Sequence, residues 1–131
     1  MKTNYILIIL VVLVVAGVIF AYSAFQNAGT DYEKKTSQSA VNIVLAPKTF
    51  DKGSFSFDIN IDTHTVELSQ FDLKELATLE INGEEFKPIT APVLNGHHTS
   101  GSLVFNIEEK PKIFSVVIKD IPDISLRRFS W

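Results

Sequence analysis

The sequence predicts an all-β fold, an immunoglobulin-like antiparallel β-sandwich preceded by one N-terminal transmembrane helix. The helix is predicted by residues 5–25, which carry no charged side chain and consist mainly of Ile, Leu and Val. The sandwich is predicted by the pattern after residue 41, where apolar and polar residues alternate with the period of two that is typical of half-buried strands. Turn-forming residues divide this pattern into roughly seven or eight short strands. A small barrel is the alternative architecture.

The pattern divides the chain of 131 residues into three segments. Residues 1–25 form a signal-anchor helix, residues 26–40 a linker and residues 41–131 the β-sandwich domain. A helix over residues 5–25 is about 30 Å long, which matches the hydrocarbon core of a bilayer. The remainder is long enough for one small domain and too short for two.

The anchor also predicts where the domain lies. Lys2 and the amino terminus make the start positive, whereas the charges directly after the span nearly cancel. Because the positive end stays in the cytoplasm, we expect a single-pass protein of the cell membrane with its domain on the extracytoplasmic side. A cleaved signal peptide is the alternative, although the apolar run is longer than usual for one and residues 21–23 make a mediocre cleavage site.

The linker, residues 26–40, is polar, rich in small residues and without an apolar period. These features are typical of an irregular connection. A helix that continues from the membrane is the alternative for this segment, with Tyr32 and the lysines at the headgroup boundary.

The first two strands differ in how they end. The alternation that begins at Val41 runs until Pro47 stops it. The next strand has its apolar residues at odd positions, namely Phe55, Phe57, Ile59 and Ile61. Beyond it the apolar positions become even, which requires a bulge, bend or break within residues 62–65.

One short helix and one tight hairpin follow. A capping-box pattern at residues 69–72 predicts one or two helical turns over residues 73–77. Asn82 and Gly83 lie between two alternating runs, which is the strongest short signal of a hairpin. A loop or edge strand bracketed by two prolines comes next.

The last third of the chain continues the alternation. After a polar turn at residues 95–101, strands are predicted over residues 103–107, 114–118 and 124–131. Arg127 and Arg128 are expected on a solvated edge. The apolar phase of the cleanest strands should be buried, and it comprises Phe57, Ile59, Leu103, Phe105, Val116 and Ile118.

Composition excludes several classes of function. The formal net charge is −3 and no basic face is visible, so no nucleic-acid binding is expected. There is no cysteine, which excludes a disulfide framework and any thiolate metal site. No nucleophile lies beside a base in a known motif, and no glycine loop for phosphate is present, so we expect no enzyme.

All 3 histidines fall in two breaks of the strand pattern. One break contains Asp62 and His64, and the other contains His97 and His98. Neutral imidazole is a common ligand for zinc and copper, and a carboxylate can complete the set. If the breaks lie at the same end of the sandwich, these four residues can form one site for copper or zinc. In the alternative they are structural, with Asp62 in a turn and the imidazoles bonded to loop carbonyls.

These breaks resemble motifs of an uncharacterised family of small extracytoplasmic bacterial and archaeal β domains. The resemblance is carried by Asp-Thr-His at residues 62–64, Gly-His-His-Thr-Ser-Gly at residues 96–101 and Arg-Phe-x-Trp at residues 128–131. It implies one β domain over most of residues 41–131 and no particular activity. The family often carries arginine after the histidine pair, where this chain has Thr99, so no role for an arginine carries over.

We therefore expect a non-enzymatic binding module displayed outside the cell membrane. In one interpretation it binds a metal ion, copper or zinc, through its histidines. In the alternative it is a protein-interaction module or an accessory subunit of a membrane complex, with structural histidines and no metal.

Overall fold

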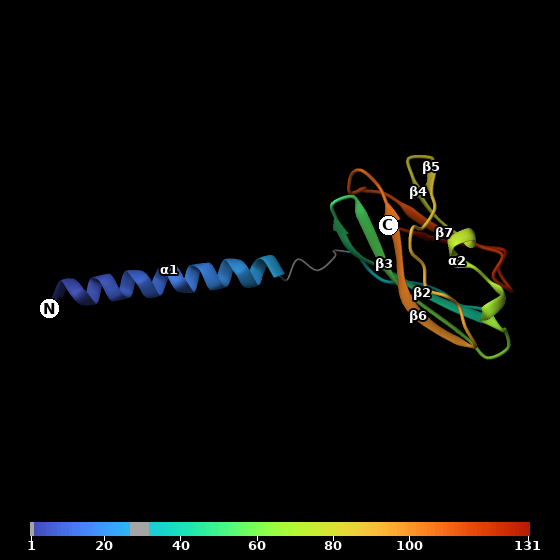
Figure 1. Cartoon of the computed structure of the whole chain (residues 1–131), viewed down its shortest axis with the longest axis horizontal. Helices are drawn as coiled ribbons and strands as arrows, with labels where there is room; N and C mark the ends of the chain where they lie inside the picture. Colours follow the sequence, from blue (N-terminus) through green and yellow to red (C-terminus); the bar gives the residue numbers. More distant parts are fainter. Residues whose placement is uncertain (1, 27–31) are drawn as a thin grey trace.

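The computed structural model of the chain describes residues 2–26 and 32–131, with side chains over residues 5–21 and 32–131. An N-terminal helix precedes two antiparallel sheets (Figure 1). The elements in chain order are α1 (Lys2–Gln26), β1 (Lys35–Ser37), β2 (Val41–Asp51), β3 (Ser54–Thr63), the 3-10 helix η1 (Leu68–Gln70), α2 (Leu73–Leu76), β4 (Ala77–Ile81), β5 (Glu84–Phe86), β6 (His98–Asn106), β7 (Ser115–Lys119) and β8 (Leu126–Ser130). The predicted β-rich class is confirmed, and the immunoglobulin-like subtype stays a prediction.

The predicted N-terminal helix is present as α1, and it begins slightly before the expected apolar run. The large apolar side chains described in α1 are exposed, with fractions from 51% at Val15 to 76% at Phe20. In the described part of the chain, no helix is both long enough and apolar enough to cross a membrane. The membrane span itself stays a prediction.

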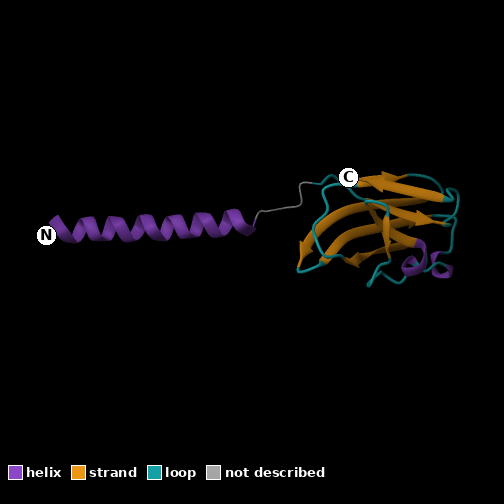
Figure 2. Cartoon of the chain, turned by 90° about the horizontal axis from the view of Figure 1, so that it is seen from above, coloured by secondary structure: helices purple, strands orange, loops and turns teal. Residues whose placement is uncertain are grey.

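Two four-stranded sheets make up the domain, and each pairs its strands antiparallel. The first sheet has the order β1-β2-β3-β6, and the second has the order β5-β4-β7-β8. The long hairpin of β2 and β3 dominates the first sheet, pairing Val41 with Thr63 at one end and Asp51 with Ser54 at the other. Figure 2 shows the strands stacked in layers, with the two short helices near one end.

The core lies between the sheets, because the apolar phase of their strands faces inward. All predicted core residues are buried, with exposed fractions of at most 1%: Phe57, Ile59, Leu103, Phe105, Val116 and Ile118. The ring of Phe57 from the first sheet meets that of Phe114 beside the second sheet at a centroid distance of 5.9 Å. The rings of Phe105 and Trp131 also contact the ring of Phe57, with centroid distances of 5.6 and 5.9 Å. Such aromatic pairs stabilise the core beyond the burial of their area.

The prediction that residues 26–40 form an irregular linker is wrong for those residues that belong to a helix or a strand. Gln26 still belongs to α1, and Lys35–Ser37 form β1, which pairs with residues 43–45 of β2. An edge strand this short needs no buried apolar face. Its polar composition therefore gave no sign of a strand in the sequence. The alternative of a helix through the whole segment is wrong for the same reason. Residues 27–31 of the predicted linker lie outside the described residues.

The residues just before β1 pack against the end of the chain. The ring of Tyr32 lies edge-on to that of Phe114, with centroids 5.2 Å apart. Trp131 Nε1 donates a hydrogen bond to the carbonyl oxygen of Glu33 at 2.6 Å. The domain therefore includes residues 32–40, which the sequence assigns to the linker.

Pro47 does not end its strand, contrary to the prediction. β2 continues through it to Asp51, and the register with β3 shifts between Pro47 and Thr49. A bulge is one of the few places where a strand accommodates proline, so the strand bends instead of stopping.

The predicted short helix and the hairpin are both present, but the cap of the helix is wrong. Ser69 lies within η1, and Asp72 caps α2 by accepting a hydrogen bond from the Lys74 amide at 2.9 Å. Asn82 and Gly83 adopt positive φ values of 50° and 85° between β4 and β5. Positive φ at both central residues makes the tight turn that the Asn-Gly pair predicts.

β8 places one arginine inside the protein, which corrects the prediction of two solvated arginines. Arg127 is only 2% exposed, whereas Arg128 forms a partly exposed ion pair with Glu80. The Arg127 guanidinium donates to the carbonyl oxygens of Ile121, Val41, Pro122 and Ile124 and to the hydroxyl of Ser39. Burial lowers the pKa of Arg127, and the negative charge of Asp123 opposes this shift.

Candidate functional site

The two histidine-containing segments lie side by side at one end of the first sheet. β6 begins at His98 and pairs Asp62 with His98, so the polar turn predicted at residues 95–101 is shorter than expected. At the end of β3, the Thr63 amide donates to the His97 carbonyl oxygen at 2.9 Å. The Leu68 amide donates to the Gly96 carbonyl oxygen at the same distance. Sequence-distant segments are therefore joined by their backbones.

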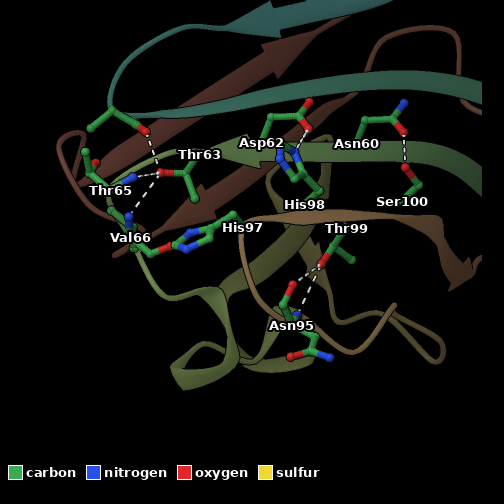
Figure 3. Close-up of polar contacts among 11 residues, drawn as sticks. Asn60, Asp62, Thr63, Thr65, Val66, Asn95, His97, His98, Thr99 and Ser100 are labelled. Carbon is green, nitrogen blue, oxygen red and sulfur yellow. Dashed lines mark hydrogen bonds and ion pairs between the residues drawn. The ribbon is translucent and has the colours of Figure 1, made fainter.

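Thr63 organises the irregular chain between them. Its hydroxyl donates to the Ala40 carbonyl oxygen at 2.7 Å and accepts from the amides of Thr65 and Val66 at 3.3 and 3.2 Å (Figure 3). β3 continues to this residue, whose side chain is buried, and the break predicted within residues 62–65 falls just after it. A hydroxyl that bonds nearby amides replaces the strand's ladder, which is why the apolar phase changes here.

His97 forms a hydrogen bond with the backbone and points away from His98 (Figure 3). Its Nδ1 lies 3.0 Å from the Val66 carbonyl oxygen, and because a carbonyl only accepts, Nδ1 is the donor. Figure 3 shows His97 pointing toward Val66, and His98 pointing toward Asp62. Adjacent residues at the start of a strand point to opposite sides. His97 is therefore not part of a shared group with His64 and His98.

Asp62 and His98 form a close polar contact at this end. Asp62 Oδ1 lies 2.6 Å from His98 Nδ1, and the two side chains are 53% and 64% exposed. A carboxylate oxygen accepts, so Nδ1 carries the proton and a neutral His98 keeps its lone pair on Nε2. Asp62 thus fixes both the orientation and the tautomer of the ring.

His64 completes the group. Its ring centroid lies 6.0 Å from that of His98, with the ring planes at 78°. Of the four predicted site residues, the structure therefore brings together Asp62, His64 and His98, which we call the histidine site. Within the described residues, no set of three or more His, Cys, Asp or Glu side chains is arranged to hold a metal ion. The site thus offers two imidazoles and one orienting carboxylate.

A row of polar pairs continues from the histidine site along the outer face of β3 and β6. Ser100 Oγ donates to Asn60 Oδ1 at 2.6 Å (Figure 3), and Asp58 accepts from Lys48 and Ser102 at 3.1 and 3.5 Å. Sequence reasoning missed this row. The alternation of polar residues in both strands was visible, but the pairing needed the register.

The two glycines in the segment of residues 96–101 are required for steric reasons. Gly96 has φ of +58°, a conformation that L side chains rarely adopt. A Cβ on Gly101 would lie 2.6 Å from the Cβ of Pro92, which packs over β6. Thr99 bonds both backbone groups of Asn95 through its hydroxyl, so the segment holds the preceding loop in place.

Glu67 lies beside this end and caps η1. Hydrogen bonds from Ser69 are the main cause that lowers the pKa of Glu67, and the nearby His97 adds the weakest contribution. The cap fixes the chain that carries the Val66 carbonyl, which in turn holds His97.

Comparison with protein-family models, with curated proteins and with solved structures gave no match to this chain. The resemblance inferred from the histidine motifs stays a prediction.

Proposed function

We propose that this protein is a membrane-anchored, extracytoplasmic binding module without enzymatic activity, and that it binds copper or zinc at the histidine site. The observation that carries the proposal is the 2.6 Å hydrogen bond between Asp62 Oδ1 and His98 Nδ1, with the His64 ring at 6.0 Å. The immunoglobulin-like class of the sandwich belongs to the same proposal and is supported by its two antiparallel sheets.

The carboxylate is the reason to assign a ligand role to His98. Metal-binding histidines usually donate their second ring nitrogen to a carboxylate or a carbonyl, which orients the ring and makes the free nitrogen more basic. Asp62 supplies this contact to Nδ1 of His98. Nε2 of His98 then faces the ligand, and exposed His64 supplies the second nitrogen by rotation of its side chain.

The donor set favours a borderline metal ion. Two imidazole nitrogens without thiolates suit zinc and copper better than magnesium or calcium, which prefer oxygen ligands. Both rings must lose their protons to bind a metal ion, so the affinity should fall as the pH is lowered.

The membrane anchor is supported by the composition of α1. Residues 5–25 have no charge, and the described large apolar side chains of this helix are exposed to solvent. Burying such a surface in lipid is favourable, and Lys2 at its start favours a cytoplasmic amino terminus.

A protein-interaction module, or an accessory subunit of a membrane complex, is the second candidate. It is favoured by the structural contacts of His97 and by the polar row beside the histidine site, which forms hydrogen bonds within itself. In that case the histidines bind no metal and the row contacts a protein partner.

The test uses the full chain, extracted from membranes with detergent, and follows its melting temperature by circular dichroism. Zinc chloride or copper(II) chloride at 100-fold excess over the dissociation constant should raise the melting temperature by roughly 10 °C or more. His64→Ala and His98→Ala should abolish the shift, and Asp62→Asn should weaken binding roughly 10- to 100-fold.

His97→Asn is the matched control, because its amide can still donate to the Val66 carbonyl oxygen. This variant should bind the metal as the wild type does. Equal shifts in the wild type and in both His64→Ala and His98→Ala would overturn the proposed site. Release of the full chain by an alkaline wash without detergent would overturn the anchor.

A further inference from the structure

We infer that the histidine site is completed by a second copy of this chain, so that one zinc ion is held by His64 and His98 of two protomers. The inference rests on the proposed function and goes beyond it by naming the ion and the source of the missing ligands. It follows from the number of donors, from their exposure and from the charge of the chain.

The number of donors comes first. A closed zinc site takes four ligands in a tetrahedron, whereas one protomer brings two imidazoles together. The near oxygen of Asp62 already accepts from His98 Nδ1, so Asp62 acts as an orienting group. In a homodimer whose two-fold axis passes through the ion, each protomer supplies two nitrogens. The ion then has four nitrogen ligands, and no other residue is needed.

The geometry of one half-site is compatible with a shared ion. Two nitrogens bound to one zinc ion lie roughly 3.3 Å apart, given zinc–nitrogen distances of about 2.0–2.1 Å and a tetrahedral angle. The rings of His64 and His98 have centroids 6.0 Å apart and near-perpendicular planes. Small rotations of the exposed His64 side chain can bring its nitrogen to this separation.

Exposure decides where the other ligands come from. The His98 and Asp62 side chains are 64% and 53% exposed, at the end of the outer face of the first sheet. A second domain can approach this end, because it is not enclosed in a cavity. If α1 anchors both copies in one membrane, their effective concentration rises.

Charge explains why the metal is needed for association. Each chain has a formal net charge of −3, so two copies repel each other at long range. A divalent cation between the two Asp62 and His98 pairs offsets this repulsion at the point of contact. Zinc suits the site better than copper(II), because copper(II) prefers a tetragonal arrangement over a tetrahedral one.

The experiment is native mass spectrometry on the full chain in detergent micelles, titrated with zinc chloride at neutral pH. We expect a monomer without metal and a dimer carrying one zinc ion at half an equivalent per chain, reversed by a chelator. His64→Ala and His98→Ala should lose the dimer, whereas His97→Asn should keep it. Asp62→Asn should shift dimer formation to roughly 10- to 100-fold higher zinc.

Each other outcome overturns the inference and separates it from the proposed function. A monomer with one zinc ion per chain removes the shared site and leaves metal binding intact. A dimer that forms equally in His64→Ala, His98→Ala and the wild type shows that another surface makes it. Absence of zinc binding at any ratio removes both this inference and zinc binding as the function.

Discussion

β3 and β8 both alternate with a period of two, and they differ in what their inward positions carry. In β3 the inward residues are all apolar or a hydrogen-bonded threonine, and the aromatic Phe55 and Phe57 are fully buried. In β8 the inward residues are Arg127 and Phe129, while the apolar Leu126 is 47% exposed. The strand register therefore decides which residues are buried. A buried position is apolar unless the protein supplies hydrogen-bond partners for a polar side chain there.

The partners in β8 are backbone carbonyls. The start of β2 and the loop before β8 direct carbonyl oxygens at the Arg127 guanidinium, and Ser39 adds a hydroxyl. These bonds satisfy the two terminal nitrogens of the guanidinium, whereas Nε is buried without a partner among the described residues. A charged group becomes tolerable inside a protein when most of its donors are hydrogen-bonded. The comparison predicts different costs for substitutions on the two strands.

The largest effect is expected on β3. Phe57→Ala should lower the free energy of unfolding by about 3–5 kcal/mol, because it empties the centre of the aromatic cluster. Leu126→Ala on β8 is the control and should cost far less, since the side chain is half exposed. Denaturant unfolding of the full chain in detergent measures both. Equal costs would contradict the inward and outward phases of the two strands.

The next effect separates the two arginines of β8. Arg127→Ala should cost about 2–4 kcal/mol, because several buried carbonyl oxygens lose a charged donor. Arg128→Ala, one residue along, removes only a partly exposed ion pair with Glu80 and should have a much smaller effect. The same unfolding experiment compares them. If Arg128→Ala proved the more damaging, the assignment of inward and outward sides in β8 would be wrong.

The smallest effect is the pH dependence of that ion pair. The hydrogen bond from Arg128 is the main cause that holds the pKa of Glu80 below its ordinary value of 4.5, while burial opposes the shift. A lowered folded-state pKa stabilises the protein above the unfolded value, and this contribution disappears as the pH falls through the folded-state pKa. Wild type should therefore melt slightly above Glu80→Gln at pH 7, and the two should converge as the pH falls below the ordinary value of 4.5 and through the lowered folded-state pKa. A difference that does not shrink as the pH falls would exclude this pair as its source.

The fold was predictable where local patterns and tertiary structure agree. The alternation in β3 and β6 fixes which residues are buried, and Asn82 with Gly83 fixes a hairpin, because both signals depend on neighbours in sequence. β1 and the inward position of Arg127 were not predictable. Their reasons lie in partners far along the chain, and no local pattern contains them.

The histidine site was predictable in part for the same reason. That the imidazoles gather in strand breaks follows from the sequence, but the contact of Asp62 with His98 depends on the pairing of β3 with β6. The exclusion of His97 depends on one further fact, which is that β6 begins at His98 and not at His97. His97 precedes β6 and bonds the Val66 carbonyl oxygen, whereas His98 lies in the strand and pairs with Asp62, so the adjacent histidines have unrelated partners.

The contact of Trp131 with Glu33 has a consequence for the connectivity of the domain. Because the last residue lies beside the point where the chain enters the domain, a short peptide can join the two ends. A circular permutant opened between Asn82 and Gly83 would then keep the strand pairs of both sheets, although the hairpin of β4 and β5 would lose its turn. For the same reason, any protein fused after Trp131 would emerge beside Glu33.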